Sequence, residues 1–130
     1  MRFDKRINQD EMVKIQSKQE TMRWLYQSVN DICNHCDISP NYEIRETFQM
    51  TYSEKITSPP DDIDIPSKGI IHLAIWDEQH GRVHDRNILI YSVLREISQI
   101  LSPGPEYDDI EAQLLNMAID LKYYNPDFLI

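Results

Sequence analysis

The sequence predicts a single α+β domain, and three observations support this. The first 40 residues carry apolar side chains at helical spacing, short apolar runs typical of strands follow, and two further helical patterns complete the chain. A chain of 130 residues suffices for one hydrophobic core and leaves no room for a second. The globular balance of 41% hydrophobic and 27% charged residues indicates a core that holds without metals or disulfides.

The first predicted element is a long helix from about Asn8 to Cys36. Asn8 and Glu11 have the spacing of a capping box at its start. Apolar residues recur every seven positions and predict one core-facing side, at Ile15, Met22, Val29 and Cys36. A break between Ser17 and Thr21 remains an alternative because the helix is unusually long, and turn residues follow it up to about residue 40.

Two strands are predicted in the middle of the chain. The first is half-buried, with alternating apolar residues on one side at Ile44, Phe48, Met50 and Tyr52. Residues 53–67 contain three prolines and four acidic residues, which predicts an exposed loop from Ser53 to Ser67. The second strand, Gly69 to Trp76, is apolar at nearly every position and is expected to be central in the sheet or covered on both faces. A turn follows it.

Two helices and a tail complete the predicted fold. Asp85 can cap a helix from Arg86 to Leu101, whose apolar residues surround most of its circumference, so we expect it in the middle of the fold. A Ser-Pro-Gly-Pro segment ends this helix, and the last helix runs from about Glu106 to Tyr123. Residues 124–130 form a tail, and its apolar end needs a surface to pack on, at Phe128, Leu129 and Ile130.

Charge and cysteine content disfavour several classes of protein. The 22 acidic and 13 basic residues give a net charge of −9, which repels nucleic acid. The apolar runs are shorter than the ~20 residues that a membrane-spanning helix needs, and the charged stretch Met1 to Asp10 is unlike a secretory leader. Two closely spaced cysteines are too few for a disulfide-stapled domain, so we expect a reducing, intracellular setting.

The central helix carries the most informative pattern, in which Arg95, Glu96 and Gln99 lie among apolar residues. In outline it resembles the His-Glu-x-x-His helix of zincin metallopeptidases. The flanking segments support the likeness: Trp76-Asp77, Asp85-Arg86-Asn87, Pro105-Glu106-Tyr107, Leu114-Leu115 and Ala118-Ile119. Over about Lys68 to Pro126 the chain resembles the small zinc-metallopeptidase-like proteins, similar to the WLM group, of large double-stranded DNA viruses. The resemblance implies a zincin-like domain located in the virion or the host cytoplasm.

The residues at the two histidine positions argue against catalytic zinc. Arg95 keeps its proton and has no lone pair to donate, and the amide oxygen of Gln99 is a poor zinc ligand. The region expected to supply a third ligand, residues 102–106, contains no histidine, so only the family's general base remains, at Glu96. We therefore expect a pseudoenzyme without metal or cofactor. An ordinary polar stripe without any such ancestry is the alternative, and on either interpretation Arg95 and Glu96 should have partners.

Other candidate ligands favour structural explanations. Cys33 and Cys36 have the spacing of half a zinc or redox site, but they end a helix on its apolar side, which favours core packing. His72 is expected to be a hydrogen-bonded core histidine rather than a ligand. His80 and His84 flank a turn and are expected to be exposed rather than to hold a surface metal together. The acidic cluster lacks the pattern of a calcium loop, at Asp61, Asp62 and Asp64.

The sequence thus predicts a catalytically inactive zincin-like domain that acts by binding proteins. The viral resemblance implies a structural role, for example as a minor capsid or other virion protein. We expect its contact surfaces at both termini, including the apolar tail, and in the loop from Ser53 to Ser67. Two alternatives remain open. One is an active metallopeptidase with unorthodox ligands, from His72, His80 or His84. The other is a regulatory module that binds peptides in the degenerate cleft.

Overall fold

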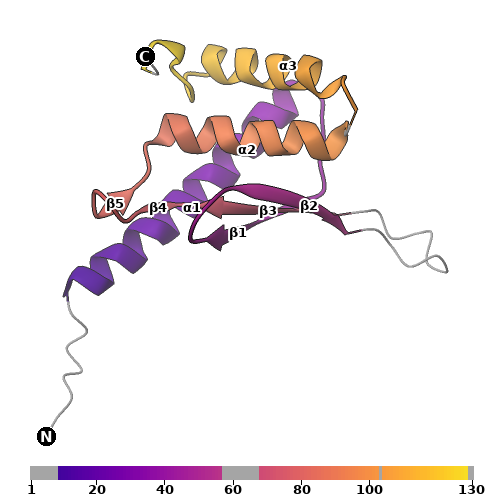
Figure 1. Ribbon diagram of the computed structural model, residues 1–130. Helices are drawn as coiled ribbons and strands as arrows, with labels where there is room; N and C mark the ends of the chain where they lie inside the picture. The colour runs from indigo at the N-terminus through magenta and orange to yellow at the C-terminus, as the bar shows by residue number, and fades with distance from the viewer. Residues whose placement is uncertain (1–8, 57–67, 103, 129–130) are drawn as a thin grey trace, which may run out of the picture.

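The fold is α+β, as predicted. The computed structural model describes residues 9–56, 68–102 and 104–128 (Figure 1). Its helices are α1 (Gln9–His35), α2 (Arg86–Leu101) and α3 (Tyr107–Asp120), and a 3₁₀ turn spans Pro126–Phe128. One sheet contains β1 (Tyr42–Thr47), β2 (Tyr52–Ile56) and β3 (Lys68–Ala74), and a small hairpin pairs β4 (Trp76–Asp77) with β5 (Arg82–Val83).

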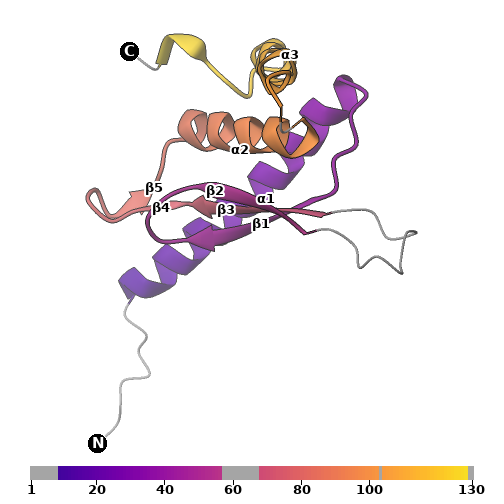
Figure 2. The same ribbon diagram turned by 45° about the vertical axis from the view of Figure 1, so that its right-hand side comes forward.

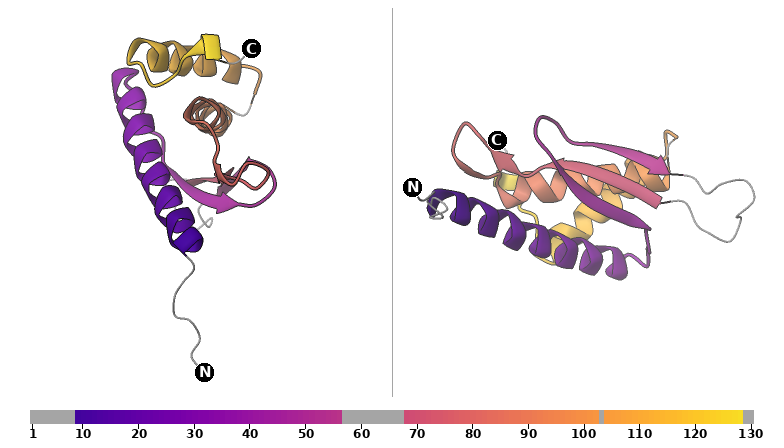
Figure 3. Two further views of the ribbon diagram at one scale, coloured as in Figure 1. Left: turned by 90° about the vertical axis from the view of Figure 1, so that its left-hand side faces the viewer. Right: turned by 90° about the horizontal axis from the view of Figure 1, so that it is seen from below.

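Helix α2 lies in the middle of the molecule, as its apolar circumference predicts. It packs between the three-stranded sheet and α3, while α1 crosses beside all three layers (Figures 2 and 3). The core is formed by fully buried side chains from α1, the sheet and the other two helices, among them Leu25, Ile32, Ile71, Leu73, Leu94, Ile97 and Leu114. Burial of α2 on two sides therefore organises the fold.

The sheet has the order β1-β3-β2, so β1 and β2 lie on opposite edges of β3. Strand β3 is parallel to β1 and antiparallel to β2. Residues 48–51, here called the crossing loop, connect the two edge strands past the end of β3, where the Thr51 hydroxyl oxygen accepts a hydrogen bond from the Ala74 N–H (3.2 Å). Strand β3 is central, as predicted.

The crossing loop corrects the prediction of one half-buried strand through Ile44, Phe48, Met50 and Tyr52. The chain must leave the sheet after β1 to reach the other edge of β3, so Phe48 and Met50 are 86% and 63% exposed. The predicted loop boundary at Ser53 is also wrong, because residues 53–56 belong to β2. The remainder of that predicted loop, with Asp61, Asp62 and Asp64, lies outside the described residues.

The two faces of the sheet differ in character. Alternate residues of β3, such as Ile71 and Leu73, pack into the core with the helices, so Lys68, Ile70 and His72 point to the other face. On that face Glu43 forms ion pairs with Lys68 (2.7 Å) and with the neighbouring Arg45. Helices therefore cover one face, and the other, here called the open face, carries the ion pairs; Ile70 on this second face is nevertheless only 1% exposed.

Helix α1 is continuous, so the alternative of a break between Ser17 and Thr21 is wrong. Its buried residues all lie from Thr21 onward, whereas Met12 and Ile15 are 54% and 46% exposed, which corrects the predicted core position of Ile15. A helix of 27 residues extends about 40 Å, whereas the six residues of β1 extend about 20 Å. The N-terminal half of α1 therefore extends past the sheet. Asn8, the predicted cap, lies outside the described residues.

The ends of α2 follow the local sequence signals. The Asp85 carboxylate accepts a hydrogen bond from the Asn87 N–H (2.8 Å), and the helix ends at Leu101, both as predicted. The Asn87 side chain also exchanges two hydrogen bonds with the backbone of Asn125 (2.9 and 3.1 Å), which ties the segment after α3 to the start of α2. Helix α3 ends at Asp120, earlier than predicted, and Lys122 adopts a positive φ of 66°. Leu129 and Ile130, at the end of the predicted tail, lie outside the described residues.

Gly69 permits the close approach of α2 to β3. A Cβ atom at this position would collide with Ile100 Cδ1 and lie 2.9 and 3.0 Å from Ile100 Cγ2 and Cγ1. We expect Gly69→Ala to lower the free energy of unfolding by about 1–3 kcal/mol in urea denaturation, because Ile100 must move as a whole. The control Gly104→Ala, where no atom lies within 4 Å of the added Cβ, should change it by less than about 0.5 kcal/mol. Equal effects of the two substitutions would contradict this role of Gly69.

Ion pairing on the open face of the sheet predicts acid sensitivity. Hydrogen bonds from Arg45, and then from Lys68, lower the pKa of Glu43 from 4.5 to about 2. Because folding lowers this pKa, the stabilisation is complete above pH 4.5 and is lost as the pH falls towards 2. We expect the free energy of unfolding to fall less steeply over this range in Glu43→Gln than in the unmodified protein, as measured by urea denaturation at successive pH values. Parallel curves would contradict the prediction.

Candidate functional site

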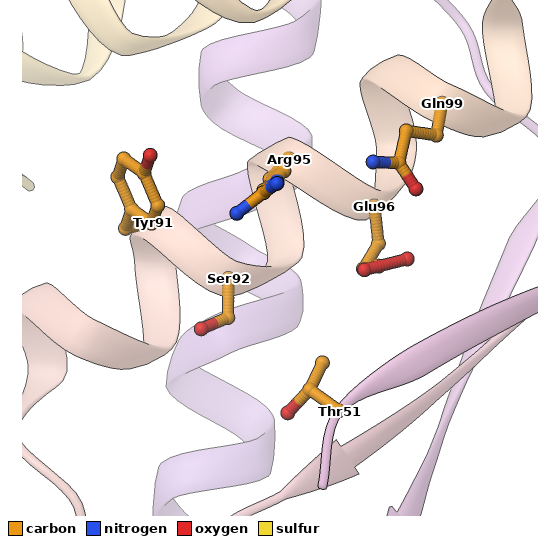
Figure 4. Close-up of a pocket in the computed structure, with 6 residues that line it drawn as sticks. All are labelled: Thr51, Tyr91, Ser92, Arg95, Glu96 and Gln99. Atoms are coloured by element: carbon orange, nitrogen blue, oxygen red, sulfur yellow. The ribbon is translucent and has the colours of Figure 1, made fainter. Parts of the chain in front are cut away.

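The polar stripe of α2 lines a pocket rather than a buried interface. The pocket has a volume of about 320 Å³, and six polar residues line it: Thr51, Tyr91, Ser92, Arg95, Glu96 and Gln99 (Figure 4). Five of them come from α2, where positions three and four apart share one face, and Thr51 comes from the crossing loop. We call this site the Arg95 pocket.

Hydrogen bonds and ring packing fix part of the pocket wall. The Ser92 hydroxyl donates to the backbone carbonyl of Ile88 (2.8 Å), and the Thr51 hydroxyl oxygen accepts from Ala74. The Tyr91 ring lies 6.2 Å from the ring of Tyr124, centroid to centroid. Its polar rim is therefore held by the sheet, by α2 itself and by the segment after α3.

Among the residues that the structure describes, the charged groups of the pocket have none of the partners that we expected for them. Within the described residues, no hydrogen bond or ion pair engages the side chain of Arg95, Glu96 or Gln99. Arg95 is exposed, and Glu96 and Gln99 are half-buried. The prediction of partners assumed burial, whereas this strip of α2 faces solvent, and no described residue bears the prediction out. The Glu96 carboxylate points towards Thr51, in a different direction from Arg95 (Figure 4).

The pocket residues are suited to hydrogen bonding rather than to metal binding. Arg95 and Gln99 occupy two positions of its rim, and a guanidinium has no lone pair for a cation. In the segment predicted to supply a third ligand, the Ser102 hydroxyl donates to Glu106 (3.4 Å). Among the described residues, no group of three His, Cys, Asp or Glu side chains is arranged to hold a metal ion.

The three candidate histidines lie in other parts of the fold. His72 is on the open face of the sheet rather than in the core; its Nε2 is 2.8 Å from the Glu54 carboxylate, and its ring stacks on Tyr52. His80 is exposed in the β4–β5 turn, as predicted, and its Nδ1 hydrogen bond to Asp77 (2.6 Å) lowers the pKa of that carboxyl. His84 follows β5 and is half-buried, so its predicted exposure is corrected.

The two cysteines pack against the core, as predicted, although α1 ends at His35 and Cys36 follows it. Cys33 is 2% exposed, and burial, with a smaller contribution from Cys36, raises the pKa of its thiol to about 12. Burial also raises the pKa of Cys36, whose Sγ lies 3.8 Å from the backbone carbonyl of Gln113. Both thiols are free and remain protonated near neutral pH.

A second hollow lies between the N-terminal half of α1 and the end of β1. It has a volume of about 310 Å³, and we call it the α1 groove; it is lined by Ile15, Lys18, Gln19, Met22, Glu46 and Ile75. The ion pair between Lys18 and Glu46 (3.0 Å) crosses from the helix to the sheet at this groove. The sequence analysis does not predict this groove, because it places Ile15 and Met22 on the core-facing side of the helix.

Sequence reasoning also missed half of the Arg95 pocket. Tyr91 and Ser92 precede Arg95 by four and three residues, so helical spacing alone could have found them. Thr51 could not have been found in this way, because its place depends on the crossing loop. The helix pattern identified the other three residues.

Comparison of the chain with family models, curated proteins and solved structures found no match. Within the described residues, no helix combines the length and the apolar character that crossing a membrane requires.

The raised thiol pKa values predict slow alkylation of the folded protein. We expect iodoacetamide at pH 7.5 to label Cys33 only on unfolding, and Cys36 much more slowly than an unfolded control, as followed by mass spectrometry. The control is the same protein in guanidinium chloride, where both thiols are accessible. Rapid labelling of both cysteines in the folded protein would contradict the burial of the two thiols and their raised pKa values.

Proposed function

We propose that this protein is a non-catalytic domain that works by binding another protein. The resemblance of the α2 region to viral zincin-like proteins supports a structural role in the virion of a large DNA virus, for example as a minor capsid protein. The absence of imidazoles at positions 95 and 99 supports a role without zinc-dependent hydrolysis. On this proposal, the scaffold acts through its surface and through the Arg95 pocket.

One observation carries the proposal: the crossing loop exposes large apolar side chains that the fold does not need. Phe48 is 86% exposed and Met50 is 63% exposed, although each lies within a few residues of a strand. Single exposed apolar residues are common, but neighbouring ones indicate an interaction surface. Burial of both side chains on a partner would remove most of their apolar surface from water.

The α1 groove extends this surface. Glu46, at its rim, is two residues from Phe48, and Ile15 and Met22 supply its apolar wall. Met12 and Val13 add further exposed apolar area on the same half of α1. The contact surfaces predicted at the two termini and in the loop from Ser53 to Ser67 stay predictions, because most of that loop and both chain ends lie outside the described residues.

The occupant that we propose is an apolar segment of a different protein with positive net charge. A second copy of this chain is disfavoured because each copy carries a charge of −9. A partner of opposite charge would approach faster and would be favoured at low salt. The proposal therefore predicts a heteromeric complex.

Photo-cross-linking tests this proposal in infected cells or virions that contain the protein. We expect p-benzoylphenylalanine in place of Phe48 to cross-link to one defined segment of another protein, identified by mass spectrometry. The additional substitution Met50→Ser should remove that cross-link, while the free energy of unfolding changes by less than about 0.5 kcal/mol because Met50 is exposed.

The matched control places the same photoreactive residue at Gln27, an exposed position in the C-terminal half of α1. This position should give no specific product. Cross-links only to a second copy, or the same scattered products from both positions, would overturn the proposal.

A further inference from the structure

The Arg95 pocket contains hydrogen-bond donors that the described part of the protein leaves unused. A guanidinium offers five N–H donors in a planar fork, and Arg95 is exposed without an ion pair to any described residue. The Gln99 carboxamide and the Tyr91 hydroxyl contribute further donors to the same pocket. Together they form a surface suited to an anion.

Carboxylates outnumber cations by 22 to 13 in this acidic chain, yet Arg95 forms no ion pair with a described residue, a property that it shares with Arg23, Arg82 and Lys122. Several other described cations have defined partners: Lys14 with Glu78, Lys18 with Glu46, Arg45 and Lys68 with Glu43, and Arg86 over the ring of Trp24. Glu96 is the nearest acid to Arg95 in sequence, but adjacent helical residues do not face each other, and Figure 4 shows the two side chains diverging. Arg95 is thus positioned to donate hydrogen bonds to a carboxylate of another molecule.

We propose that the Arg95 pocket binds the carboxylate of an Asp or Glu side chain in a segment of the partner protein. Arg95 and Gln99 donate hydrogen bonds to this carboxylate, and Glu96 accepts a hydrogen bond from a backbone N–H of the same segment. The inference rests on the proposed function and adds the chemistry by which the partner is recognised. Charge-assisted hydrogen bonds of this kind are short and roughly twice as strong as neutral ones.

The surroundings of the pocket favour a protein segment over a small acid. Arg95 is exposed, so a small ligand would leave the guanidinium partly hydrated, whereas a protein surface would exclude water from it. The crossing loop connects the pocket to apolar surface, because Thr51 lines the pocket while Phe48 and Met50 are exposed beside it in sequence. We therefore infer an acidic residue flanked by apolar residues.

The net charge of −9 is compatible with a single carboxylate at this position. Repulsion from distant surface charges is screened beyond about 8–10 Å at physiological salt, while hydrogen bonds within the pocket act at contact. In a run of acidic residues, each carboxylate would be repelled by the negative surface of this protein, so binding would be weaker. The recognised segment is therefore one acidic residue in an otherwise neutral or basic context.

Titration of the ¹⁵N-labelled full chain with defined peptides tests the inference. The probe is a blocked peptide, acetyl-Ser-Leu-Glu-Leu-Ser-amide, and its matched control replaces Glu with Gln. We expect the Glu peptide to shift the Arg95 Nε–H and Gln99 side-chain signals in NMR spectra. The Gln peptide should bind at least tenfold more weakly, because it cannot form charge-assisted hydrogen bonds.

Variants of the chain test which residue recognises the carboxylate. Arg95→Gln should weaken binding of the Glu peptide at least tenfold, and Arg95→Lys should restore only part of it, because an ammonium lacks the planar fork. Arg23→Gln removes an exposed cation from α1 and should leave binding unchanged. Both positions are exposed, and thermal unfolding should confirm that each of the three variants is folded.

Three outcomes would overturn the inference: equal binding of the Glu and Gln peptides, unchanged binding in Arg95→Gln, or no binding of the Glu peptide. Tighter binding of a peptide whose only carboxylate is its C-terminus, or of acetate alone, would also overturn it. The pocket would then recognise a carboxylate that does not belong to a side chain. Each of these results leaves the cross-link from position 48 unaffected. Loss of that cross-link, in contrast, would refute the proposed function itself.

Discussion

The burial of α2 on two sides is the constraint on which the remaining structure depends. The helix must contact the sheet and α3 at once, and it approaches the sheet closely because Gly69 has no side chain beneath Ile100. Such an arrangement leaves a single strip of the helix open to solvent. The strip repeats at helical spacing through Ser92, Arg95 and Gln99. The site is therefore a consequence of how the core is packed.

The crossing loop is a consequence of the strand order in the sheet. Because β3 lies between β1 and β2, four residues must span two strand spacings, or about 10 Å, at the end of β3. So short a connection cannot fold back onto the core, and its apolar side chains face outward. Thr51 is the exception, since its hydroxyl satisfies the Ala74 N–H. The loop begins two residues after Glu46, which lines the α1 groove, and ends at Thr51, which lines the Arg95 pocket.

Local signals in the sequence predicted some elements well. The bounds of α2 follow from Asp85 at one end and the proline-rich stop at the other, and both act within a few residues. The separation of β1 from β2 could not be predicted, since it depends on pairing with a strand that begins at residue 68. The exposure of Ile15 depends likewise on the length of the sheet beside α1. Helix ends can be predicted from a single sequence because they depend on nearby residues. Strand pairing between distant segments, and the length of a helix relative to the sheet beside it, cannot.

The exposure of Arg95 means that its side chain can be exchanged without a change in the fold. Substitutions at exposed helical positions away from caps and packing contacts usually change stability by less than about 0.5 kcal/mol. Arg95 is exposed and makes no contact that the core requires, so the fold tolerates a guanidinium there as well as an imidazole. The buried positions on the other side of α2, such as Leu94 and Ile97, have no such freedom. On the proposed relationship to zincin-like proteins, binding chemistry at this strip could therefore be exchanged without any compensating change in the core.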